Sequence, residues 1–247
     1  ARRMDTPHRS DSAFLRLARD IPASPLNHTA RAYKVFEMNE ALSSTHYLRG
    51  EEALGALSLR YPRHTDLVGS LYLQLMDHYI DRQLYDDAGR IGRIVSTRFV
   101  RDEDILSRMR TLNGTIQLHR NNLSGALDCF NRCIASYQVS SMGMWNAWMH
   151  LAHINEYRGR LKDAHTIYEK VFNECPRSVP LPWTARINAA LVKYRMAKND
   201  FPAGMLTEVV EGRHPFAVPR LIARYYKGSV TDQQFKERWD FFHPGDK

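Results

Sequence analysis

Apolar residues recur along most of this chain at intervals of three and four positions, which is the spacing of amphipathic helices. The clearest stretch predicts a helix through Trp148 that ends in a turn at Gly159. A second helix follows from Leu161 to Val171 and ends before Pro176. Glycine closes a helix in the left-handed conformation at little cost, and proline cannot continue one. Because alternating strand-like runs are scarce, the pattern predicts an all-α protein.

A small residue recurs every 38 positions in these helical surroundings, at Ala88, Ala126 and Ala164. Ala53 and the pair Ala203/Gly204 extend the series more weakly on both sides. A repeat of about 20–50 residues is typical of a solenoid, in which each unit buries its apolar face only against its neighbours. Small residues at these positions would let two antiparallel helices approach closely. The sequence therefore predicts a stack of helix hairpins.

One unit carries a fuller signature, which consists of Trp148, Leu151, Ala152, Gly159, Ala164, Tyr168 and Pro176. This spacing resembles the tetratricopeptide (TPR) repeat, a helix–turn–helix unit of about 34 residues. The preceding unit has Gly114, Asn121, Ala126 and Phe130 at the corresponding positions. The resemblance extends over roughly Val35 to Glu211 and implies a right-handed α-solenoid of about five antiparallel hairpins with a C-terminal capping helix. The residues beyond the TPR length are expected in linkers such as 140–143.

The expected domains are an extended basic N-terminal arm at 1–30, TPR-like helical repeats at 31–211 and C-terminal capping helices at 212–247. The arm holds five arginines and three prolines but few apolar side chains, which favours a strap that becomes ordered on a partner. Packing of Phe14 and Leu17 on the first hairpin is the alternative. Helices are predicted at 217–226 and 231–242, where polar-faced elements would seal the end of the repeats.

In TPR arrays the first helix of each unit lines a concave groove, so the register identifies candidates for partner binding. They are Asp77, Asp81, Arg108, Thr115, His119, His153, Glu156, Arg186 and Lys193. This set is mixed in sign with a basic tilt. A familiar TPR clamp holds a C-terminal carboxylate with paired Lys and Asn side chains. The clamp positions here are Leu73 with Asp77, Thr111 with Thr115, and Met149 with His153, so a co-chaperone of that kind is disfavoured.

A second repeat family also fits in part. Residues 144–147 and 187–189 resemble the opening of pentatricopeptide (PPR) repeats, helical hairpins that read single-stranded RNA one base per unit. The spacing from Asn146 to Ala164 is too long for that family, and the spacing from Asn113 to Ala126 is too short. The TPR-like interpretation is therefore favoured, and the RNA-binding one remains the alternative.

The chain carries a formal net charge of +8, and most of its basic residues are arginine. A basic excess favours polyanionic partners, and arginine pairs well with phosphate and carboxylate groups. However, the tightest basic run, from Arg90 to Arg101, is followed at once by three acidic residues at 102–104. A solvated outer helix face explains this run as well as a phosphate-binding track does.

Candidate chemistry is thin. Cys129 and Cys133 share one helix face, and with Cys175 they make an odd number, which favours packing over a disulfide framework. His150, His153 and Glu156 drift around their helix and form a poor ligand set, so neither a metal nor a cofactor is expected. No phosphate-cradling loop, nucleophile elbow or zinc-protease motif is present. The sequence thus argues against an enzyme with a small-molecule substrate, and no apolar run reaches the length of a membrane span.

These observations favour a non-catalytic helical-repeat scaffold subunit that mediates protein–protein interactions within a larger assembly. The alternative is a PPR-like organellar RNA-binding protein or a ribosome-associated subunit. The chain opens on Ala1 rather than Met, and its first residues are rich in arginine, which suits a processed mitochondrial protein. A cytoplasmic location is the other expectation, and secretion is not expected.

Overall fold

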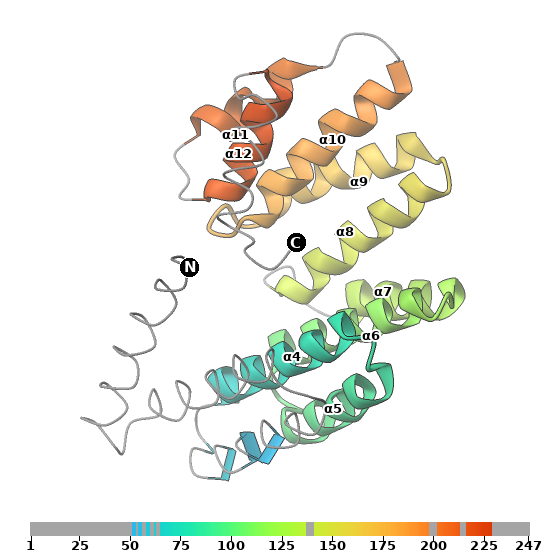
Figure 1. Ribbon diagram of the computed structural model, residues 1–247, viewed down its shortest axis with the longest axis vertical. Helices are drawn as coiled ribbons and strands as arrows, with labels where there is room; N and C mark the ends of the chain where they lie inside the picture. The colour runs from blue at the N-terminus through green and yellow to red at the C-terminus, as the bar shows by residue number, and fades with distance from the viewer. Residues whose placement is uncertain are drawn as a thin grey trace, which may run out of the picture. The chain divides into compact units, whose positions relative to one another are not determined.

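The computed structural model describes residues 51–52, 54–55, 58–59, 62, 65–136, 141–197, 202–212 and 216–228. Every regular element within these ranges is a helix, so the all-α prediction is confirmed at this level (Figure 1). The predicted arm at 1–30, the first residues of the repeats and the helix predicted at 231–242 lie outside the described residues.

The chain divides into two compact units, residues 1–122 and residues 123–247. The N-terminal unit contains α4 (Thr65–Asp81), α5 (Tyr85–Arg98) and α6 (Glu103–His119). Helix α4 packs against both α5 and α6, and α5 also packs against α6. The buried face of α4 supplies much of the core of this unit, with Val68, Leu71, Tyr72, Leu73, Leu75, Met76, Tyr79 and Ile80.

Close contact between these helices depends on glycine. A Cβ atom added at Gly69 of α4 would lie 2.9 Å from Cγ1 of Ile105 on α6. A Cβ atom at Gly92 of α5 would lie 3.2 Å from Oδ1 of Asn113 on α6. Carbon atoms in a packed interior lie about 3.5–4.0 Å apart, so the side chain that glycine lacks is what lets α6 approach both neighbours.

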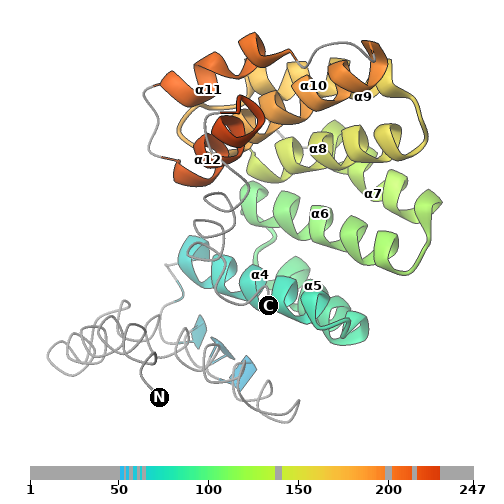
Figure 2. The same cartoon turned by 45° about the horizontal axis from the view of Figure 1, so that its top comes forward.

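The C-terminal unit contains α7 (Leu123–Ser136), α8 (Met142–Tyr157), α9 (Leu161–Glu174), α10 (Leu181–Ala197), the 3₁₀-helix η2 (Ala203–Leu206), α11 (Thr207–Glu211) and α12 (Ala217–Tyr226). Each of α7, α8, α9 and α10 packs against the next, and α10 also contacts α8, α11 and α12. Figure 2 shows α11 and α12 lying beside α10 in this unit. The predicted helix at 217–226 is confirmed, because α12 has these bounds.

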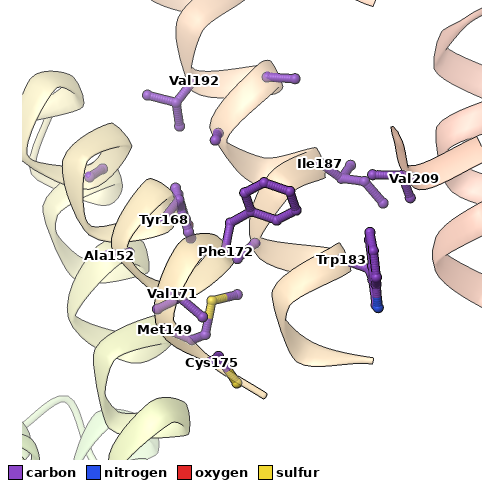
Figure 3. Packing of buried hydrophobic residues seen from close by; sticks show 14 of the residues in the cluster. Met149, Ala152, Tyr168, Val171, Phe172, Cys175, Trp183, Ile187, Val192 and Val209 are labelled. Carbon is purple, nitrogen blue, oxygen red and sulfur yellow. The ribbon is translucent and has the colours of Figure 1, made fainter. Parts of the chain in front are cut away.

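The core of the C-terminal unit has the small-against-large pattern that the repeat signature predicts. Ala152 on α8 and Ala164 on α9 are fully buried, and Tyr168 fills the space beside them (Figure 3). The neighbouring parts of the cluster come from α9 and α10, where Phe172 meets Trp183 at a ring-centroid distance of 6.1 Å. The buried position predicted for Ala164 is confirmed.

The 38-residue period is present in the backbone as well as in the sequence. Gln83, Asn121 and Gly159 lie 38 positions apart and have φ values of 61°, 57° and 74°, in the left-handed region. In each turn the following N–H donates to the carbonyl oxygen five residues earlier, at 2.8 Å. This is the hydrogen bond of a Schellman helix ending. The left-handed turns predicted at Asn121 and Gly159 are confirmed.

The helix bounds follow the same period. Helices α5, α7 and α9 are each 14 residues long and begin 38 residues apart. They follow the three left-handed turns, so the pairs α4–α5, α6–α7 and α8–α9 are three copies of one local helix–turn–helix pattern. The second copy spans the boundary between the two units, and each of its helices is described within its own unit.

Two details differ from the sequence-based expectation. The linker expected at 140–143 is shorter than predicted, because α8 begins at Met142 and takes in Gly143. Ser141 starts this helix by accepting a hydrogen bond from the backbone N–H of Met144 at 3.3 Å. After α10, the second helix predicted to open at Pro202 is instead the short 3₁₀-helix η2 followed by α11.

Candidate interaction surface

The nine groove candidates lie on four helices, each described within its own unit. The N-terminal unit holds Asp77 and Asp81 on α4, and Arg108, Thr115 and His119 on α6. The C-terminal unit holds His153 and Glu156 on α8, and Arg186 and Lys193 on α10.

In the N-terminal unit, an arginine links α6 to the acidic side of α4. Arg108 donates from Nη1 to Oγ of Ser70 at 3.3 Å and forms an ion pair with Asp104 at 3.7 Å. Partial desolvation and the charge of Asp81 raise the pKa of Asp77, while Arg108 acts in the opposite direction. Asp77, Asp81 and Arg108 therefore influence one another, and the surface they share is mixed in sign, as the sequence predicts.

The other two candidates of this unit have local partners. Thr115 donates from Oγ1 to the carbonyl oxygen of Thr111 on its own helix at 3.3 Å. His119 stacks on the ring of Tyr85 at the start of α5, with a centroid distance of 5.7 Å. Arg120 approaches the same ring at 5.9 Å and pairs with Asp86. These contacts give His119 a role in joining α6 to α5.

In the C-terminal unit, a row of polar side chains joins α8 to α10. Glu156 accepts a hydrogen bond from the Tyr168 hydroxyl on Oε2 at 3.0 Å, and its other oxygen pairs with Arg195. One turn earlier on α8, Nε2 of His153 lies 3.3 Å from Nδ2 of Asn188. Arg195 and Asn188 lie seven residues apart on α10 and so share one helix face. The structure thus brings His153 and Glu156 together and adds Asn188 and Arg195, which the sequence analysis did not select.

The two histidines of α8 favour the neutral state. Burial lowers the pKa of His150 to about 4, and the neighbouring His153 adds to this effect. The His150 ring stacks on Phe130 of α7 with a centroid distance of 4.8 Å. Desolvation also lowers the pKa of His153, although the charge of Glu156 opposes the shift. A neutral His153 accepts the Asn188 N–H on Nε2, which matches the observed contact.

The two remaining candidates on α10 lie apart from this row. Arg186 forms two hydrogen bonds from Nη1 to the Glu169 carboxylate of α9, at 2.7 and 2.9 Å. Its Nε donates to the carbonyl oxygen of Met205, and its guanidinium lies 4.7 Å from the centroid of Phe172. These contacts hold Arg186 between α10, α9 and η2, on the opposite side of α10 from Arg195. Lys193 is exposed.

The basic run of α5 is tied into the fold at two points. Arg90 pairs with both Glu51 and Asp87, and these carboxylates raise its pKa. Arg98 lies 3.4 Å from the hydroxyl of Tyr72. Arg93 and Arg101 are exposed. At least half of the run therefore contacts the protein itself, which favours the solvated-face interpretation of this segment.

Exposed apolar side chains gather beside the α8–α10 row. Tyr157, the last residue of α8, is 90% exposed, and Tyr194 and Met196, which flank Arg195 on α10, are 44% and 36% exposed. Single exposed apolar residues are common on proteins, whereas a group of them indicates an interaction site. We call Tyr157, Tyr194 and Met196 the aromatic patch.

The cysteines contribute to packing. Cys133 and Cys175 are buried, and burial raises the pKa of the Cys175 thiol to about 11, which makes it a poor nucleophile. Within the described ranges, no three His, Cys, Asp or Glu side chains gather as a metal site would require. None of the helices described is both long and apolar enough to cross a bilayer.

The sequence matches no known family model, and no curated protein matches it. What can be inferred of its function comes from the residues and geometry of the chain itself.

Proposed function

We propose that this protein is a non-catalytic helical-repeat scaffold that binds other protein subunits within a larger assembly. The observation that carries this proposal is the threefold recurrence of one helix–turn–helix pattern, with left-handed turns at Gln83, Asn121 and Gly159. A unit of this size cannot bury its apolar face alone, and stacked copies create a long surface suited to binding macromolecules.

The packing of α8, α9 and α10 supports a solenoid. In a TPR-like array the first helix of one unit contacts both helices of the unit before it. Helix α10 does this, because it packs against α9 and also touches α8. The His153–Asn188 and Glu156–Arg195 contacts link the exposed sides of these two first helices. Such links would keep a groove-lining surface in register.

The surface is better suited to protein than to RNA. Arg186, the basic candidate on α10 nearest to Asn188, is paired with Glu169. The amide of Asn188, which the PPR-like alternative would use to select a base, contacts His153. Glu156 places a carboxylate in the same row, which would oppose a phosphate backbone. A mitochondrial setting remains part of the proposal and is tested by locating a tagged full-length chain in cell fractions.

The experiment is an affinity purification of the tagged full chain with and without nuclease, repeated at rising salt concentration. A scaffold should retain the same protein partners after nuclease treatment, with little loss at moderate salt. An RNA-binding protein should lose its partners with nuclease, and its RNA affinity should fall steeply with salt, as phosphate contacts require. Loss of all protein partners on nuclease treatment would contradict the scaffold proposal.

A further inference from the structure

We propose that the aromatic patch at the C-terminal ends of α8 and α10 binds an acidic, apolar-bearing segment of a partner protein. This inference rests on the proposed scaffold function and names the surface and the chemistry of its ligand. Tyrosine, methionine and arginine are enriched at the centres of protein interfaces, and these residue types meet here.

The two ends of the patch are held together by the polar row beneath it. Tyr157 directly follows Glu156 on α8, while Tyr194 and Met196 flank Arg195 on α10. The Glu156–Arg195 ion pair therefore fixes the last turns of the two helices next to each other. Glu156 is further oriented by the Tyr168 hydroxyl at 3.0 Å. A surface ordered in advance binds with a smaller loss of conformational entropy.

The repeat itself does not require these residues. Asp81 and His119 occupy the positions equivalent to Tyr157, one and two repeats earlier, and the same left-handed turn forms after each of them. Arg160 likewise corresponds to Leu84 and Asn122. The fold thus tolerates small or polar side chains at both places, and the C-terminal copy carries an exposed ring and a cation there.

The charge around the patch favours an acidic ligand. Arg158 and Arg160 follow Tyr157 directly and are exposed, and neither takes part in an ion pair among the described residues. The carboxylate of Glu156 is already neutralised by Arg195. Two cations are therefore available next to Tyr157, where they can pair with carboxylates and steer an acidic segment toward the ring.

The test measures binding of the full chain to a fluorescent peptide of alternating glutamate and leucine with one central tryptophan. A lysine-for-glutamate version of the peptide and an oligouridine of similar length are the comparison probes. Tyr157→Ser and Arg160→Asn should each weaken binding of the acidic peptide, with the tyrosine change costing on the order of tenfold or more. Tyr226→Ser is the matched control, because this tyrosine of α12 is also exposed, at 40%.

Equal binding of the acidic peptide by wild type and Tyr157→Ser would overturn the proposal, as would tighter binding of the lysine peptide or of the oligouridine. Arg160→Asn keeps the test informative if the tyrosine variant misfolds, since asparagine favours the start of a helix. Replacing residue 157 or 226 with a photocrosslinking amino acid separates this failure from failure of the scaffold function. Crosslinks to protein from 226 alone would leave the scaffold standing without this surface, whereas crosslinks to RNA alone would contradict both.

Discussion

Substitution of Gly69 by alanine tests whether α4 and α6 approach as closely as the structure shows. The new Cβ would lie 2.9 Å from Cγ1 and 3.1 Å from Cγ2 of Ile105, two atoms that are bonded directly to its Cβ and cannot swing away. Reaching an ordinary carbon contact requires a shift of roughly 0.5 Å or more, and overpacking of this kind costs about 1–3 kcal/mol. Alanine regains about 1 kcal/mol in helix propensity over glycine. We expect Gly69→Ala to lower the free energy of unfolding by up to about 2 kcal/mol.

Gly89→Ala is the matched control for this prediction. Gly89 lies inside α5 of the same unit, and a Cβ there meets nothing within 4 Å. This variant should therefore gain about 0.5–1 kcal/mol, because only the helix propensity changes. Urea unfolding followed by far-ultraviolet circular dichroism measures both variants. The two glycines should thus respond with opposite signs to the same chemical change.

A double-mutant cycle with Ile105→Ala identifies the cause. Ile105 is buried, so this change alone should cost about 2–5 kcal/mol. It also removes the atoms that the new Cβ meets, and on this background Gly69→Ala should become neutral or stabilising, a coupling of about 1–3 kcal/mol. If Gly69→Ala stabilises the wild-type chain as much as Gly89→Ala does, the close approach of α4 and α6 is wrong, and so is the repeat register built on it.

Three further predictions concern the C-terminal unit. Ala164→Leu should destabilise it by about 1–3 kcal/mol in thermal unfolding, whereas Ala135→Leu on the exposed side of α7 should have little effect; equal melting temperatures would contradict the buried hairpin. Stability should fall as the pH drops from 6.5 to about 4, by up to ~3 kcal/mol, because the unfolded chain binds a proton that the folded His150 excludes. His150→Phe keeps the ring on Phe130 and should flatten that pH dependence of the urea midpoint; an unchanged slope would mean that other groups cause it. Arg186→Gln should cost about 1–3 kcal/mol by leaving Glu169 unpaired, while Lys193→Gln should change stability by less than about 0.5 kcal/mol; similar losses in both would refute the structural role of Arg186.

The sequence predicted the helices well where the signals are local. Apolar spacing and a glycine or asparagine at the turn were enough for α8, α9 and α12. Gln83 shows the limit of residue preference, since glutamine has little tendency toward positive φ, and only its place 38 residues before Asn121 indicates a turn. The 3₁₀-helix η2 was missed because a short 3₁₀ turn and an α-helix share nearly the same apolar spacing.

The side-chain partners of α10 could not be read from its sequence. This helix buries residues on more than one face, including Trp183, Ala185, Ile187, Ala189 and Val192. A helix without a single apolar stripe does not reveal which way its polar residues point. Arg186 was therefore placed in the groove although it pairs with Glu169, and Arg195 was overlooked although it pairs with Glu156. Only tertiary contacts distinguish the two arginines.

The three repeat copies separate structural residues from specialised ones within a single chain. Arg82, Arg120 and Arg158 occupy the same position, directly before the left-handed residue. A cation there lies at the C-terminal end of a helix, where the helix dipole favours positive charge, so these arginines have a structural reason in every copy. Part of the net charge of +8 thus follows from how the repeats are built, and it is weak support for an RNA partner. Binding specificity is better sought where the copies differ, above all at Tyr157 and Arg160, because the fold alone does not explain these side chains.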